Sequence, residues 1–260
     1  MIWNEILWKS AADRPVPTVC SPRFLIAVLC YALFLCVNLP KETWPSNVMY
    51  LFRLSCSYGF YVFFFLCAAI PYATSFLADT ENHYLHLLLK QVPPAAYSFS
   101  RCIAVAVSGF LAISAAMGLL LLFLCLQYPF QTADTISYSG WASLIEAGNP
   151  VSYLLINVWL TGATGSVFAV LALVFSTRVK NSFVVLSFPV LLYYLASVLA
   201  TTLKLPVWMD ISVMLYVPVD NGNLPGSLLY VSSFLLVLFM FACFIFTWQI
   251  GRLRNNGCSS

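Results

Sequence analysis

The sequence predicts an all-α, polytopic membrane protein with six transmembrane helices. Apolar residues make up 62% of the chain and charged residues only 8%, which leaves too little polar surface to cover a soluble globule. The apolar residues also come in long runs with almost no charge inside them, and a hydrocarbon core about 30 Å thick needs about 20 such residues per helix. We therefore expect a single transmembrane domain over residues 1–260. Its spans are expected at about 24–40, 54–78, 102–127, 151–177, 182–203 and 228–250.

The basic residues predict the orientation of these spans. Lys and Arg next to a span are retained on the cytoplasmic side. With both termini inside, nine basic residues are cytoplasmic and three are external: Lys9, Arg14, Arg23, Lys90, Arg101, Arg178, Lys180, Arg252 and Arg254 against Lys41, Arg53 and Lys204. We expect a multi-pass protein of the plasma membrane, with the N- and C-termini in the cytoplasm.

The first 22 residues precede the first span and have an amphipathic pattern. Apolar side chains fall at helical spacing, and tryptophans that can anchor at a membrane interface accompany them: Ile2, Trp3, Ile6, Leu7 and Trp8. We expect a short interfacial helix here, with a frayed tail as the alternative. Pro15 and Pro17 would end that helix before the first span.

The sequence offers no catalytic constellation, no cofactor site and no metal site. No ionisable residue lies at mid-depth in a span, which argues against a carrier driven by an ion gradient, although Asn157, Thr161, Thr164 and Ser166 could still line a polar path. His83 and His86 lack the HExxH pattern of a zinc protease, and the cysteines form no CxxC pair. The chain is expected to be no enzyme and to bind no nucleic acid.

Glycine and proline positions within the spans predict packing features. Small residues at 162–166, with the sequence GATGS, are typical of a face where two helices pack closely. Pro71 and Pro189 lie inside the second and fifth expected spans and should kink them. The sequence leaves open whether these kinks act as hinges or are merely accommodated by packing.

The loop between the second and third spans, residues 79–101, is strongly patterned. Asp79 or Thr80 can cap a short helix that Pro93 and Pro94 would end. One face of that helix would be apolar and the other polar: Tyr84, Leu85, Leu88 and Leu89 against Glu81, His83, His86 and Lys90. Such a helix either lies on the lipid surface or docks into a partner protein, and its acids and histidines favour the partner.

The same region carries a family resemblance. The stretch IPYATSFLADTENHYLHLLLKQVPPAAYSFSRCIAVAVSGFL resembles ATP-binding-cassette (ABC) transporter permeases of the type 2 exporter class. In that family an acidic turn ends a span, a short helix follows, and a Tyr-x-x-Ser-Lys-like step leads into the next span. The matching positions here are Glu81, Tyr84 or Leu85, Leu88, Leu89, Tyr97, Ser100 and Arg101. The amphipathic start with Glu5, followed by SPRF at Ser21–Phe24, is also similar to that family.

The resemblance implies the membrane-spanning permease subunit of an ABC exporter. Such a subunit forms the translocation path, pairs with a second permease copy or homologue, and is driven by a separate cytoplasmic ATPase that binds the ATP. The implied ATPase-coupling surface comprises Glu5, Asp79, Glu81, Tyr84, Leu85, Leu88, Lys90 and Arg101. The stretch 204–227 would form a re-entrant or interfacial element on the outer face. The alternative from another class is a membrane scaffold or assembly factor that transports nothing.

Overall fold

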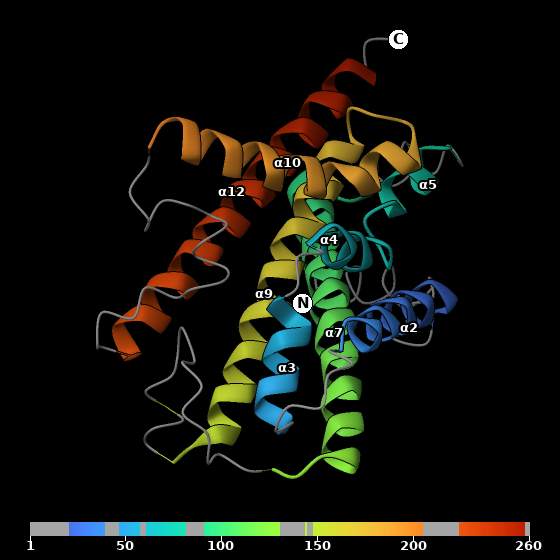
Figure 1. Cartoon of the computed structure of the whole chain (residues 1–260). Helices are drawn as coiled ribbons and strands as arrows, with labels where there is room; N and C mark the ends of the chain where they lie inside the picture. The colour runs from blue at the N-terminus through green and yellow to red at the C-terminus, as the bar shows by residue number, and fades with distance from the viewer. Residues whose placement is uncertain are drawn as a thin grey trace, which may run out of the picture.

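The computed structural model describes residues 21–39, 47–57, 61–81, 91–130, 144, 148–204 and 224–257, and these residues contain helices and turns but no strand. The helices are α2 (Pro22–Val37), α3 (Val48–Ser57), α4 (Tyr61–Ala69), α5 (Ser75–Glu81), α7 (Pro94–Gln127), α9 (Pro150–Ser176), α10 (Ser182–Thr202) and α12 (Leu224–Gly257) (Figure 1). The expected all-α class is confirmed for this part of the chain. The re-entrant element expected within 204–227 lies almost wholly outside it.

Four of these helices, α7, α9, α10 and α12, are long and apolar enough to cross a membrane. They coincide with the third to sixth expected spans, and their bounds follow from local signals in the sequence. Pro94 and Pro150 occupy the first turns of α7 and α9, where a missing N–H costs nothing. Asn181 caps α10 by accepting a hydrogen bond of 2.9 Å from the Phe183 amide.

The first two expected spans differ more from the structure. The first span, expected at about 24–40, corresponds to α2, which begins at Pro22 after Ser21, whose hydroxyl accepts from the Phe24 amide at 3.2 Å, and has only 16 residues. The second span, expected to be continuous over 54–78, is divided among α3, α4 and α5. Pro71 lies in the turn between α4 and α5, so it ends a helix rather than kinking one. Pro189, in contrast, lies within the continuous helix α10.

The centre of the fold is the antiparallel pair α7 and α9, which run side by side in Figure 1. The helix α12 packs against both, and the C-terminal ends of α9 and α12 are joined by a hydrogen bond of 2.6 Å from Thr177 Oγ1 to Gln249 Oε1. The helices α10 and α2 cross this pair instead of running along it (Figure 1). One end of the molecule contains the starts of α7 and α10 and the ends of α5, α9 and α12 (Figure 1).

Small residues allow α7 and α9 to approach closely, as the GATGS stretch predicts. A Cβ atom at Gly162 would lie 2.5 Å from Ser114 Oγ and 3.0 Å from the Phe110 ring of α7. At Gly165 a Cβ would lie 3.0 Å from Ile113 Cγ1. The stretch is therefore a helix-packing face, and no nucleophile is assembled from it.

Candidate functional site

An ion pair joins the end of α5 to the start of α7. Arg101 Nη2 donates a hydrogen bond to Asp79 Oδ2, and the side chains of Arg101 and Asp79 are only 10% and 15% exposed. Two buried charges of opposite sign are tolerable because each compensates the other. The pair forms because α5 ends beside the first two turns of α7, which brings the two flanks of segment 82–90 together.

Two tyrosines complete the arrangement. The Tyr97 hydroxyl donates to Asp79 Oδ2 at 3.1 Å, and Arg101 Nη1 donates to the Tyr72 hydroxyl. The Arg101 guanidinium carbon also lies 5.3 Å from the ring centre of Tyr72 and 5.6 Å from that of Tyr97, within the range of cation–π attraction. We call Tyr72, Asp79, Tyr97 and Arg101 the Asp79–Arg101 cluster.

The cluster lies on an apolar core formed by α5, α7, α9 and α12. Tyr97 belongs to an apolar group that includes Phe76 of α5, Val170 of α9 and Phe246 of α12. The rings of Phe76 and Phe246 meet edge to face, with their centres 5.8 Å apart. A displacement of α5 would therefore change its packing against α7, α9 and α12, the helices that contribute the other residues of this apolar group.

The residues expected to couple to an ATPase divide into three groups. Asp79 and Arg101 are brought together, but they face each other inside the protein rather than an external partner. Glu81 is exposed at the end of α5. Glu5, Tyr84, Leu85, Leu88 and Lys90 lie outside the described residues.

Tyr72 is a residue of this cluster that no pattern in the sequence predicts. Tyr72 lies in the turn between α4 and α5, outside the helix that carries Asp79, so no helical spacing in the sequence indicates its place in the cluster. Tyr97 was part of the family-like step but was not recognised as a partner of the carboxylate. A pairing of Asp79 with Arg101 was equally hidden, because 22 residues separate them and only the fold closes that distance.

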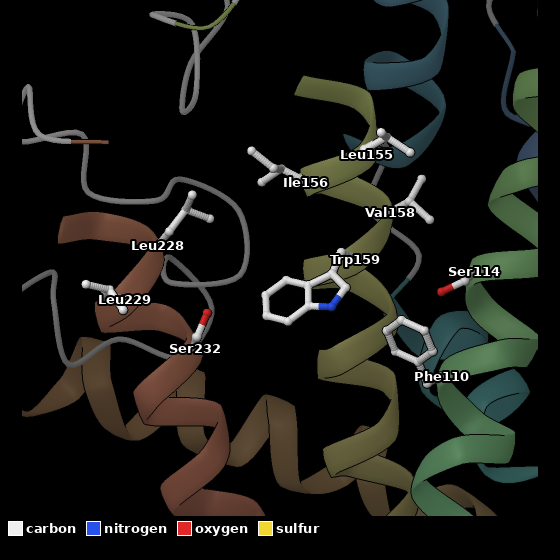
Figure 2. Close-up of a pocket in the computed structure, with 9 residues that line it drawn as sticks. All are labelled: Phe110, Ser114, Leu155, Ile156, Val158, Trp159, Leu228, Leu229 and Ser232. Carbon is white, nitrogen blue, oxygen red and sulfur yellow. The ribbon is translucent and has the colours of Figure 1, made fainter. Parts of the chain in front are cut away.

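A large apolar groove occupies the other end of the α7–α9 pair. Its volume is about 630 Å³ and its lining is almost wholly apolar. Figure 2 shows its walls: Phe110 and Ser114 of α7, Leu155, Ile156, Val158 and Trp159 of α9, and Leu228, Leu229 and Ser232 of α12. A concave apolar surface with few polar groups is suited to an apolar ligand.

Three of the four polar residues of α9 that could line a path bond to their own helix. Asn157 Nδ2 donates to the Tyr153 carbonyl at 2.8 Å, Thr164 Oγ1 to the Leu160 carbonyl at 2.9 Å, and Ser166 Oγ to the Ala163 carbonyl at 2.6 Å. Each of these side chains thus bonds to its own helix. Within the described residues, no group of three or more His, Cys, Asp or Glu side chains could hold a metal ion.

Fold and site together define an all-helical membrane protein with a buried ion-pair cluster at one end and an apolar groove toward the other. No family model, characterised protein or solved structure matches the chain.

Proposed function

We propose that the chain is the membrane-spanning permease subunit of an ABC exporter, driven by a separate cytoplasmic ATPase. The observation that carries this proposal is the Asp79–Arg101 cluster. A segment that transmits force from a partner must be attached firmly at both ends, and the cluster ties both flanks of segment 82–90 to the helical core. Segment 82–90 is the stretch whose sequence resembles a coupling helix.

The proposal includes the six expected membrane passes, with α2 and α10 as separate spans although they cross the α7–α9 pair in the structure (Figure 1), and with both termini in the cytoplasm of a cell bounded by its plasma membrane. The end of the molecule that holds the cluster also holds Arg101, Arg178, Lys180, Arg252 and Arg254, because these residues start or follow helices whose ends meet there. Such a concentration of positive charge favours the cytoplasmic side. The segment 82–90 would then face a cytoplasmic ATPase.

The apolar groove favours an apolar cargo. Among the described residues that line the groove, from α7, α9 and α12, the polar groups are the Ser114 and Ser232 hydroxyls and the Trp159 indole (Figure 2). A molecule with an acyl chain or a fused-ring skeleton would fit such a lining, whereas a charged solute would lose its hydration there without compensation. A second permease copy or homologue would complete the path.

The competing function is a membrane scaffold or assembly factor. It is favoured by the local hydrogen bonds of Asn157, Thr164 and Ser166, since a helix whose polar groups are satisfied internally needs no water-filled path. In that case segment 82–90 would dock a protein other than an ATPase.

Affinity purification of the tagged chain in mild detergent, followed by mass spectrometry, separates the two functions. Recovery of a cytoplasmic ATPase is expected, with ATP hydrolysis stimulated by the chain. Glu81→Lys should lower that stimulation without unfolding the protein, because Glu81 is exposed. Lys180→Glu is the matched control: it reverses an exposed charge at the same end of the molecule, between α9 and α10, and should leave stimulation unchanged.

Two results would contradict the proposal. Unchanged stimulation in Glu81→Lys would remove the coupling role of this surface. Failure to recover any ATPase in several detergents would favour the scaffold.

A further inference from the structure

A second pocket lies at the opposite end of α12 from the apolar groove. It has a volume of about 520 Å³ and is lined by Pro94, Trp248, Gly251, Arg252 and Arg254. Pro94 is the first residue of α7, and the other four belong to the last turns of α12. We call this the arginine pocket.

The arginine pocket carries two positive charges that no acidic side chain among the described residues pairs with. Arg252 and Arg254 are exposed, and neither forms an ion pair with any other residue that the structure describes. The Arg252 guanidinium carbon lies 5.8 Å from the ring centre of Trp248, which holds it over the aromatic face. The start of α7 has no side-chain cap, so the positive end of its dipole adds to the field of the two arginines. The electrostatic potential in the pocket should therefore be positive and should favour binding of an anion.

The position of the pocket along α12 corresponds to the level of lipid headgroups. The apolar run of α12 ends at residue 250, directly before Gly251. Trp248 is 55% exposed, and tryptophan is enriched where the hydrocarbon core meets the headgroups. Because the Thr177–Gln249 hydrogen bond joins the ends of α9 and α12, the pocket shares its side of the membrane with Arg178 and Lys180. This is the side on which anionic lipids attract basic residues.

An exposed apolar stripe on α12 leads into the pocket. Val237, Phe241 and Phe244 are 64%, 58% and 69% exposed, and they are followed on the same face by Trp248. Their spacing of three and four residues aligns them along one side of the helix. An acyl chain lying on this stripe would bring its headgroup to Arg252, one turn beyond Trp248.

We propose that the arginine pocket binds the phosphate of an anionic phospholipid, whose acyl chains lie along the stripe from Val237 to Trp248. Arg252 and Arg254 would hold the phosphate through charge-assisted hydrogen bonds, which the forked guanidinium groups can make in pairs. The proposal goes beyond the proposed transport function and does not depend on it, because it rests on the membrane location and on the geometry of α7 and α12.

Binding of dioleoyl phosphatidylglycerol to the purified chain in detergent tests the proposal. The bound lipid is counted by native mass spectrometry, with dioleoyl phosphatidylcholine as the zwitterionic comparison. Phosphatidylglycerol should be retained in preference to phosphatidylcholine. Inorganic phosphate at millimolar concentration should not displace it, since free phosphate has no chain to lie on the stripe.

Three variants locate the site. Each arginine near the membrane surface contributes roughly fivefold to the binding of an anionic lipid, so Arg252→Gln with Arg254→Gln should weaken binding on the order of 25-fold. The matched control, Arg178→Gln with Lys180→Gln, removes the same charge at the same end outside the pocket and should have little effect. Gly251→Leu fills the pocket and keeps both arginines, and it should also abolish the preference for phosphatidylglycerol.

All three variants should remain folded. Arg178, Lys180, Arg252 and Arg254 are exposed, and a Cβ atom at Gly251 would meet no other atom within 4 Å. Monodisperse elution on gel filtration checks this. Equal losses in the two double variants would show diffuse charge attraction and overturn the proposal. Displacement by inorganic phosphate, or unchanged binding in Gly251→Leu, would overturn it as well.

Discussion

Asp79 and Arg101 are 22 residues apart in the sequence, yet their side chains form a buried ion pair between the end of α5 and the start of α7. The pair joins the two residues that flank segment 82–90, to which the proposed function assigns ATPase coupling. A charge at this depth is stable only while its partner remains, so the two residues should behave as one unit.

A double-mutant cycle tests that unit. Asp79→Asn or Arg101→Gln alone leaves the other charge buried without a counter-charge and should destabilise the protein by about 3–5 kcal/mol. The double variant should lose less than the sum of the two, with a coupling of about 1–3 kcal/mol. The measurement is unfolding in detergent followed by circular dichroism. Additive losses would mean that the pair contributes nothing beyond its separate parts.

The tyrosine hydroxyls make a separate contribution. Tyr97→Phe keeps the ring near Arg101 but removes the donor to Asp79, and a hydrogen bond to a charged group contributes about 1.5–3 kcal/mol. Tyr97→Leu removes the ring as well and should cost more. Tyr128→Phe is the control, since the Tyr128 hydroxyl has no hydrogen bond to the described residues. Equal melting temperatures for Tyr97→Phe and Tyr128→Phe would refute a role for the hydroxyl.

The sequence predicted the elements of this fold best where a span is one uninterrupted apolar run. The bounds of α9 and α10 agree to within a residue with the expected spans 151–177 and 182–203, and in the structure these helices begin at Pro150 and directly after the capping residue Asn181. Hydropathy predicts one helix over 54–78 and Pro71 predicts a kink within it, but neither predicts that the span is divided among three helices with Pro71 in the turn between α4 and α5. Hydropathy also does not indicate the angle at which one helix packs on another, so the sequence did not predict that α10 crosses α7 and α9 (Figure 1).

The candidate site was predictable only in part for a related reason. The sequence indicates Asp79 as a possible helix cap and Arg101 as part of the family-like step into the third span, but a pattern along the chain cannot distinguish a residue that faces a partner from one that pairs internally. The arginine pocket and the apolar groove each need at least two helices from distant parts of the sequence. Both sites arise from packing, and at the apolar groove Gly162 sets how closely α9 approaches Phe110 and Ser114 of α7.

Close packing of α7 gives a matched pair of variants on a single helix. A Cβ atom at Gly109 would lie 3.1 Å from both the Ala68 carbonyl oxygen and Ala169 Cβ, whereas one at Gly118 would meet nothing within 4 Å. Gly109→Leu should destabilise the protein by about 1–3 kcal/mol or more, because the backbone of α4 cannot move aside easily. Gly118→Leu should be neutral or slightly stabilising, since glycine is a poor helix former. Equal stabilities would refute close packing of α4 and α9 at Gly109.

The proposed orientation can be tested by reporters placed at the two ends of α9. Residue 148 precedes α9 and residue 180 follows it, so the two positions lie on opposite sides of the membrane if α9 spans it. The basic residues Arg178 and Lys180 favour the cytoplasm for the second position. Alkaline phosphatase fused after residue 148 should be active and a fusion after residue 180 inactive, while green fluorescent protein should give the reverse pattern. A fusion after residue 254 should match the one after residue 180, because the Thr177–Gln249 hydrogen bond joins the ends of α9 and α12. Opposite results at 180 and 254 would contradict both the orientation and the packing of these helices, whereas inversion of all three signals would contradict the orientation alone.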